Sequence, residues 1–529
     1  MAFGVAFSSA IELSDTTTSH ADEGGRGPPI KGKGTPQDQQ DMWRIGRKQE
    51  LNRNFGFFSI LGFTSILMCT WEAVLLSSAI GLINGGPAGM IYTYIAVAIG
   101  CGAVSLTLAE MASMAPSAGG HYHWVSEFAP PNCQKILSYI TGWLAVLSWQ
   151  TSMASTASTM SSMIVSVINI YHMDADHLHV EPWLIVLITI LTALVAILFN
   201  TFLAQRLSLF EGMILILHCF AFLLFIIPLW LLAPKRTAPE IFTDFQDNGN
   251  WGNIGLACIV GMTSPLFAML GIDGALHLAE EIKDASRVLP RGIVWTYILN
   301  SATGFIALVF YTFCMPDVDE FLRTEGVYPF VYIFYKISGS VGAATGVFSV
   351  MMILLLASTI SNVTTTSRML YAFARDGGLP FSAFLSKVDT RFVVPLNAIY
   401  ATFGIVSILS LISLGSSVAG TAILSACNGT FLAAYLISLS CLWLRRVRGQ
   451  PLPPGRWNLG RWATTVELVA ILFVMISLVA SCFPTYRSVN SKSMNYSSLL
   501  IGAIVLFSTA HYFLFARKYF QGPVSLVRK

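Results

Sequence analysis

Four polar side chains follow an apolar stretch near the middle of the chain and could carry chemistry there. Asp273, His277, Glu280 and Glu281 come after IGLACIVGMTSPLFAM, at spacings i, i+4, i+7 and i+8. A helix places these spacings on one face. A charge in hydrocarbon costs at least ~2.5–3.5 kcal/mol, which makes an intramembrane carboxylate a candidate functional group. The pattern predicts a face turned to protein or to a water path, where an Asp–His–Glu series could relay protons. Alternatively, Asp273 makes a helix-pairing hydrogen bond and the glutamates are solvated at a helix end.

A second acidic residue lies within an apolar run nearer the N-terminus. Glu72 stands in MCTWEAVLLSS, where it could bind a substrate ammonium or take a proton. Trp71, Trp149 and Phe267 could form an aromatic surface for a cation, each contact being worth ~0.5–2 kcal/mol, although most aromatic residues in such a chain pack the core. His218, in a later apolar run, is interpreted as a satisfied core histidine.

These residues must be positioned by membrane-spanning helices. The 529 residues are 54% hydrophobic and only 11% charged, whereas an ordinary soluble domain carries about 25% charged residues. The net charge of +3 does not indicate a nucleic-acid partner. The nine cysteines include no CxxC pair, and neither HExxH nor GxSxG occurs, so the sequence predicts no metal, no cofactor and no enzymatic activity.

Twelve segments are apolar over about the 20 residues that a spanning helix needs. They are 55–83, 89–114, 134–168, 182–202, 207–233, 252–280, 291–315, 338–373, 396–414, 417–444, 463–483 and 497–516. The third and the eighth are unusually long. The polar, Gly- and Pro-rich residues 1–54 are expected to be a disordered tail, and 517–529 a short C-terminal tail.

The distribution of basic residues predicts the orientation of the spans. With the N-terminus in the cytoplasm, only six of the 31 Lys and Arg residues fall in outer segments. Cytoplasmic segments carry an excess of Lys and Arg, so both termini should be cytoplasmic. Asn495, in NYS, would then lie outside and is a candidate glycosylation site.

The first ten spans divide into two matching halves, 55–233 and 252–444, followed by two extra spans in 463–516. The first span of each half carries a mid-membrane acid, Glu72 or Asp273, and the third member of each half is the long one. Because five is an odd number, the halves insert in opposite orientations. Inverted repeats with interrupted helices at matching positions are typical of secondary transporters. Gly271 and Gly274 tolerate unwinding of the sixth span, which would free backbone groups to bind a polar solute.

Several stretches resemble a known family. They are GGPAGMIYTYI (85–95), EMASMAPSAGGHYHWVSEFAPP (110–131), DGALHLAEEIKDASRVLPRGI (273–293), SRMLYAFARDGGLPFS (367–382), VPLNA (394–398), GRWNLGRW (455–462) and MNYSSLLIG (494–502). Together they resemble the amino acid–polyamine–organocation superfamily, and within it the fungal amino acid/choline group that includes GABA and choline permeases.

The resemblance implies substrate binding at breaks in spans 1 and 6. Carried onto this chain, the first break falls near Thr70 to Val74 and includes Ala73, and the second near Phe267 to Asp273. Asp273, His277 and Glu281 match the acidic–His–acidic pattern of a group whose members are usually proton-coupled. Glu72 matches no shared motif.

The expected function is proton-coupled uptake of a small nitrogenous solute, such as an amino acid, GABA, choline or another amine. The expected location is the plasma membrane, with an internal membrane as the alternative. A different class of function is a nutrient receptor, which would bind the same ligands without accumulating them. The sequence does not choose the substrate.

Overall fold

The structure is a computed structural model that describes residues 34–172, 180–315, 328–415, 418–490, 493–520 and 522–523. The chain divides into two compact units, Met1–Lys31 and Gly32–Lys529. The first unit lies outside the described residues, as does most of the predicted N-terminal tail. Everything below concerns the second unit.

Twelve helical segments of the described chain are long and apolar enough to cross a membrane, as the sequence predicts. In chain order they are α2–α3 (Phe57–Met68, Thr70–Leu76), α5 (Gly86–Met114), α7 (Gln134–Asn169), α8 (Pro182–Phe202), α9 (Leu207–Leu232), α11–α12–η3 (Ile254–Gly261, Thr263–Met269, Ile272–Glu281), α13 (Ala285–Cys314), α16 (Val341–Arg375), α18 (Leu396–Gly415), α19 (Val418–Val447), α20 (Ala463–Ala480) and α21 (Ser497–Leu514). Shorter helices join them: α1 (Pro36–Arg44), α4 (Ser78–Ile83), α6 (His121–Phe128), α10 (Ala238–Phe242), α15 (Pro329–Ser338) and α17 (Ser382–Leu385), with single turns η1 (Ile170–His172), η2 (Ala204–Arg206), η4 (Gly460–Trp462) and η5 (Ala516–Lys518).

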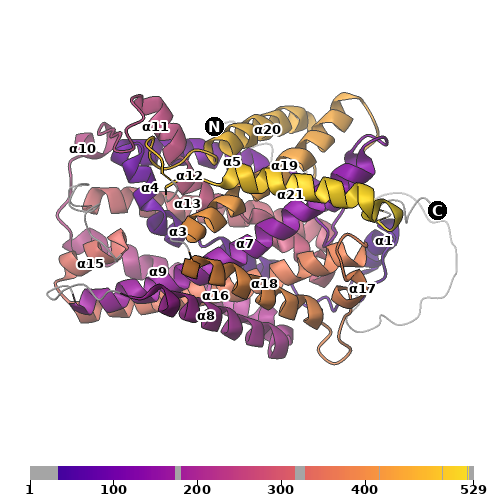
Figure 1. Cartoon of the computed structure of the whole chain (residues 1–529), viewed down its shortest axis with the longest axis horizontal. Coiled ribbons are helices and arrows are strands. Elements are labelled where there is room, and N and C mark those ends of the chain that lie inside the picture. Colours follow the sequence, from indigo (N-terminus) through magenta and orange to yellow (C-terminus); the bar gives the residue numbers. More distant parts are fainter. Residues whose placement is uncertain are drawn as a thin grey trace, which may run out of the picture. The chain divides into compact units, whose positions relative to one another are not determined.

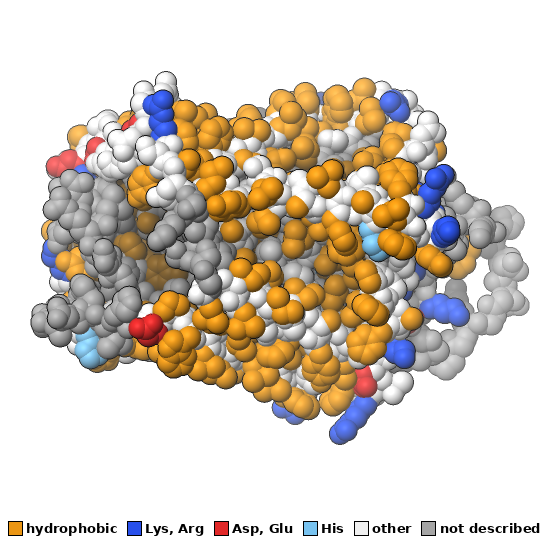
Figure 2. Space-filling model, in the orientation of Figure 1, with side chains coloured by type: hydrophobic (Ala, Val, Ile, Leu, Met, Phe, Trp, Pro, Cys, Tyr) orange, Lys and Arg blue, Asp and Glu red, His pale blue; other side chains and the backbone are white. Residues whose placement is uncertain are grey.

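The spans run side by side and present apolar side chains to the surroundings. Figure 1 shows α1 and α17 at one end of the bundle and α10, α11 and α15 at the other; these ends are called the α1 side and the α10 side. Figure 2 shows hydrophobic side chains over the middle of the visible face, with most of the visible Lys and Arg toward the α1 side. This distribution suits a bilayer, whose hydrocarbon layer excludes charge.

The predicted twelve-helix architecture with broken spans 1 and 6 is confirmed. Span 1 breaks between α2 and α3, and span 6 breaks between α12 and η3. The third and eighth spans, α7 and α16, are the long ones, at 36 and 35 residues. They pack against each other and place their middles beside the two breaks.

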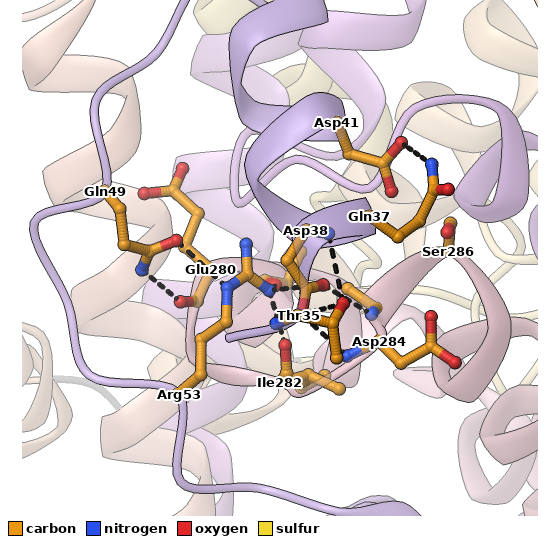
Figure 3. Close-up of polar contacts among 12 residues, drawn as sticks. Thr35, Gln37, Asp38, Asp41, Gln49, Arg53, Glu280, Ile282, Asp284 and Ser286 are labelled. Atoms are coloured by element: carbon orange, nitrogen blue, oxygen red, sulfur yellow. Dashed lines mark hydrogen bonds and ion pairs between the residues drawn. The ribbon is translucent and has the colours of Figure 1, made fainter. Parts of the chain in front are cut away.

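The predicted disordered tail spans residues 1–54, and its described part, residues 34–54, contains helix α1 and contacts the start of α13. Helix α1 begins with a capping box, in which Thr35 and Asp38 exchange side-chain and backbone hydrogen bonds. Asp38 also accepts hydrogen bonds from the backbone N–H groups of Asp284 (2.9 Å) and Ala285 (3.0 Å), and it pairs with Arg53 (3.2 Å) (Figure 3). Polar composition predicts disorder when no partner is in view, but here the partners lie far along the chain, at the start of α13.

Candidate functional site

The break in span 1 is held by a residue that is not glycine. Cys69 has a left-handed backbone conformation (φ +43°), with α2 ending at Met68 and α3 beginning at Thr70. A non-glycine residue in this region costs about 1–3 kcal/mol and persists only where its surroundings fix it. Ser358 of α16 donates a hydrogen bond to the carbonyl of Leu67 (3.3 Å), next to the break. The strain is therefore built into the site, one residue before the predicted position.

The break in span 6 is formed at a glycine with positive φ. Leu270 is extended, Gly271 has φ +85°, and the chain continues as the ten-residue 3-10 segment η3. Runs of 3-10 helix longer than three or four residues are uncommon. A Cβ on Gly274 would lie 2.0 Å from a methyl carbon of Leu67, so a larger residue here would have to displace the Leu67 side chain beside the first break. Thr70 ties them directly by donating a hydrogen bond to the carbonyl of Ala268 (2.9 Å).

A cavity of about 70 Å³ lies between the two breaks and is called the central cavity. Its lining combines three aromatic rings with hydroxyl and amide groups: Trp149, Phe267, Phe431, Ser152, Thr156, Thr159, Asn362 and Asn428. No charged side chain of the described residues lines it. The Nε1 atom of Trp149 and the Oδ1 atom of Asn428 are buried without a hydrogen-bond partner in the described structure. The central cavity thus combines aromatic faces with hydroxyl and amide groups, which fits a small polar or cationic ligand.

Two larger cavities lie on the α10 side of the central cavity. They measure about 400 and 370 Å³ and share Ser77, Ala79 and Ile80 in their linings. Phe267 lines both of them and the central cavity as well. The side chain of Phe267 therefore stands between the central cavity and the wider space on the α10 side.

Asp273 lies two residues beyond the break, in a buried cluster rather than on the wall of the central cavity. Tyr435 of α19 donates a hydrogen bond to its Oδ1 (2.5 Å), and Nε2 of His121 lies 3.3 Å from its Oδ2. Nε2 of His277 lies 3.7 Å from the same oxygen and makes no hydrogen bond. Nδ1 of His277 lies 2.8 Å from the carbonyl of Ala118. A carbonyl only accepts, so Nδ1 must carry a proton.

The tautomer of His277 has a consequence for the charge of this cluster. If His277 is neutral, its Nε2 presents a lone pair to Asp273, and the two repel unless Asp273 is protonated. If His277 is cationic, the contact is an ion pair. Either favourable arrangement holds one exchangeable proton in the cluster of Asp273 and its two histidines, since Nε2 of His121 lies nearer to the same oxygen than Nε2 of His277 does. Trp149, which lines the central cavity, packs edge-on against His277 (5.6 Å between ring centroids).

The α1 side is closed by ion pairs between η3 and its neighbours. Arg375 binds both oxygens of Glu280 (2.6 and 2.8 Å), and Arg368 binds Glu281 (2.8 Å). Arg47 pairs with Asp376, which also accepts a hydrogen bond from Tyr122 (3.0 Å).

Two groups of the closed side, outside the spans, have shifted pKa values. Burial raises the pKa of Asp376, although Arg47 and Arg375 oppose the shift. Burial, followed by the charges of Arg47 and Arg44, lowers the pKa of His123 to about 3, so this histidine is neutral near pH 7.

Most of the predicted site residues lie in or next to the two breaks. Ala73, Trp149, Phe267 and Gly271 line the central cavity, while Thr70 links the two breaks. Asp273 and His277 form the adjacent cluster, and Glu281 belongs to the closed side.

Trp71 and Glu72 do not line the central cavity. They lie against α9, where Trp71 packs on Phe225 and Glu72 faces His218. Asn495 lines the 370 Å³ cavity, and its Nδ2 donates to the carbonyls of Ser481 and Phe483 (both 2.8 Å). An attached glycan would have to replace these two hydrogen bonds.

Sequence reasoning missed His121 and Tyr435, which complete the Asp273 cluster. His121 sits in the SAGGHYHW stretch, and its position directly after two glycines, within a stretch that carries the resemblance, could have marked it. Tyr435 stands in an apolar span among many aromatic residues, and nothing in the sequence separates it from packing residues.

Comparison with known proteins identifies the family. A family model described as amino acid permease matches residues 55–506. A Macrophomina phaseolina protein, provisionally assigned as an amino acid/polyamine transporter, is 32% identical over 83% of this chain and 97% of its own. The choline transporter of Saccharomyces cerevisiae is 27% identical over 89% of this chain and 83% of its own. An amino-acid permease of Arabidopsis thaliana is 27% identical over 92% of this chain and 96% of its own.

A solved structure shares the fold. The crystal structure of the Eremococcus coleocola manganese transporter matches with a TM-score of 0.51 at 14% identity, covering 89% of this chain and 94% of that one. At this identity the likeness speaks for the fold alone. The family match spans most of the described helices, and the chain belongs to the amino acid permease family of multi-pass membrane transporters.

Proposed function

We propose that the chain is a proton-coupled secondary transporter that imports a small nitrogenous solute, such as an amino acid, GABA, choline or a related amine. The observation that carries the proposal is the central cavity between two broken helices, with the Asp273 cluster beside it. The broken helices free backbone groups for a polar solute, and the aromatic rings accept a cationic head group. Relatives named as amino-acid and choline transporters support this substrate class.

Asp273 and His277 are the proposed carriers of the coupling proton. Their contact is favourable only while they hold one exchangeable proton. Release of that proton would leave the buried carboxylate of Asp273 opposite a lone pair of His277, with Tyr435 and His121 as its remaining polar neighbours. A solute that fills the central cavity next to Trp149 would therefore be linked to the protonation of the cluster through Trp149 and His277.

The proposed orientation places the α1 side in the cytoplasm, because basic residues gather there (Figure 2). The structure then corresponds to a state open toward the outside and closed toward the cytoplasm. The proposed location is the plasma membrane.

The test is uptake of labelled GABA, choline and a panel of amino acids by permease-deficient cells, with and without a proton uncoupler. We expect accumulation of one compound, abolished by the uncoupler. We also expect Asp273→Asn, at equal surface abundance, to lose at least about 90% of accumulation, while the matched control Asp244→Asn, at a partly exposed ion pair, keeps it. Accumulation that ignores the uncoupler, or an Asp273→Asn variant with unchanged pH dependence, would overturn the proton coupling.

A further inference from the structure

Glu72 and His218 form a second buried pair, on the face of α3 that points away from the central cavity. Oε1 of Glu72 lies 3.0 Å from Nδ1 of His218, and the two side chains are 0% and 2% exposed. The ring N–H does not point along the contact. Neither carboxylate oxygen and neither ring nitrogen makes a hydrogen bond within the described structure. Buried charged groups are normally satisfied, so four unpartnered atoms at one contact require an explanation.

Proton counting gives that explanation. With one exchangeable proton the pair is either Glu⁻ with His⁺ or Glu–H with neutral His, and its net charge is zero. Without that proton, an ionised carboxylate is left buried with no counter-charge, which is costly in a low-dielectric interior. The dry pair therefore retains one proton, and the proton can leave only when water reaches the pair.

Among the described residues, the ion pairs bring no other basic side chain to Glu72. On α9, Glu211 accepts a hydrogen bond from Ser361 (2.7 Å) and is a further acid, within electrostatic reach of Cys69 as Glu72 is. On α13 the hydroxyl of Tyr311 contacts Ser78, and on α15 Lys336 lies over the ring of Tyr332. In the described part of the chain, the ion pairs of Glu72 are confined to His218.

The pair is mechanically linked to the site. Helix α3 carries Ala73 on the wall of the central cavity and begins at the strained residue Cys69, three positions before Glu72. A movement of α3 relative to α9 that accompanies opening or closing at the break would change the distance between Glu72 and His218. We propose that Glu72 and His218 form a second proton-binding site, distinct from Asp273, whose proton is taken up and released as α3 moves against α9.

Trp71 provides a direct probe of this site. Its ring lies 6.0 Å from that of His218, and a protonated imidazole quenches indole fluorescence. The experiment is a pH titration of tryptophan fluorescence of the full-length protein in lipid nanodiscs, for the wild type and for Trp71→Phe, which keeps an aromatic ring against Phe225. The difference between the two isolates the Trp71 signal from the other tryptophans.

The difference signal should be weaker in acid than in base, because a protonated His218 ring quenches Trp71. His218→Gln should abolish this step, and Glu72→Gln should change it, because a carboxylate no longer faces the ring. The control His511→Gln, a histidine bonded to Tyr139 in another span, should leave it unchanged. A flat difference signal, or a step that persists in His218→Gln, would overturn the proposal.

A second arm tests the role in transport, and it rests on the proposed function. Uptake by Glu72→Gln and by His218→Gln should lose the acceleration that external acid gives the wild type. If the wild type accumulates substrate but both variants keep its pH dependence, the second site is wrong and the proposed function stands. If the wild type accumulates nothing, the proposed function fails, and the fluorescence titration alone decides whether the pair binds a proton.

Discussion

The two sides of the central cavity differ in the types of residue that form them. On the α10 side, cavities of about 400 and 370 Å³ are lined by uncharged residues, both apolar ones such as Ile80 and small or hydroxyl-bearing ones such as Ala79 and Ser77. On the α1 side, the path is filled by arginine–carboxylate pairs, among which Arg375 binds both oxygens of the fully buried Glu280. The α10 side therefore contains open cavities, whereas the α1 side is closed by ion pairs.

This difference bears on how such a closure could open. When the closed side opens, each charged side chain loses its partner but becomes hydrated again. The free energies of the paired and the hydrated states are therefore close. A closure of large apolar side chains would gain no such compensation from water. Charged pairs thus suit a contact that must form and break repeatedly, yet they make the closed side sensitive to removal of a single partner.

The largest effect should come from breaking the bidentate pair of the closed side. Arg375→Gln removes both bonds to Glu280, which is fully buried and would be left unpaired. Removing one partner of a buried pair costs about 3–5 kcal/mol. We expect a marked drop of the thermal unfolding midpoint in detergent, partly restored in the double variant with Glu280→Gln.

Arg391→Gln serves as the control for that prediction, since Arg391 is an exposed arginine on the same side. If Arg375→Gln were no less stable than Arg391→Gln, the closure would not depend on this pair.

The next largest effect concerns the N-terminal segment that supports the closed side. Asp38→Asn should cost about 1.5–3 kcal/mol at pH 7, because a charged acceptor of two backbone N–H groups is lost together with the pair to Arg53. Burial alone would raise the pKa of Asp38, but hydrogen bonds from Thr35 and Ala285, together with Arg53, hold it below its ordinary value.

The stabilisation by Asp38 is therefore present above the ordinary pKa of about 4 and is lost as the pH falls through the lowered value. The free energy of unfolding at pH 7 and at pH 3 should show the difference between wild type and Asp38→Asn shrinking in acid. Asp41→Asn, one turn further along α1, is the control. A constant difference would mean that Asp38 acts by packing alone.

The lowered pKa of His123 predicts that the closed side loses stability in acid, as Asp38 does, but for a different reason. Its pKa of about 3 in the folded protein lies below the unfolded value of about 6.5, so below pH 6.5 the unfolded chain binds a proton that the folded chain does not. Stability should fall by up to about 1.4 kcal/mol per pH unit, or about 2 kcal/mol at pH 5. His123→Gln should remove this part of the pH dependence of unfolding. Parallel curves for wild type and variant would contradict it.

Sequence reasoning located the spans and one of the two breaks for clear physical reasons. A run of about 20 apolar residues must cross a bilayer, and Gly271 provides the positive φ at which span 6 unwinds. The spacing of Asp273 and His277 also places them together, because residues four apart share a helix face.

The rest depends on contacts that no local pattern encodes. Cys69 holds the first break although its type disfavours the conformation, and its sequence context therefore gives no signal. Glu72 lies in a segment that is buried all round, so periodicity does not tell which side it faces. Tyr435 reaches Asp273 across 162 positions, a distance that only the fold closes.

The smallest effect should arise on the open side, at the residue shared by all three cavities. Phe267→Ala removes an aromatic wall of the central cavity, which should raise the KM of uptake about five- to tenfold, equivalent to about 1–1.4 kcal/mol. Because Phe267 is only partly buried, the unfolding midpoint should change less than in Arg375→Gln. The control is Phe245→Ala, an exposed ring stacked on Tyr92 outside these cavities. If Phe267→Ala left KM unchanged but destabilised the protein as strongly as Arg375→Gln, Phe267 would be a structural residue rather than part of the binding site. The open and the closed side would then not differ in their contribution to stability.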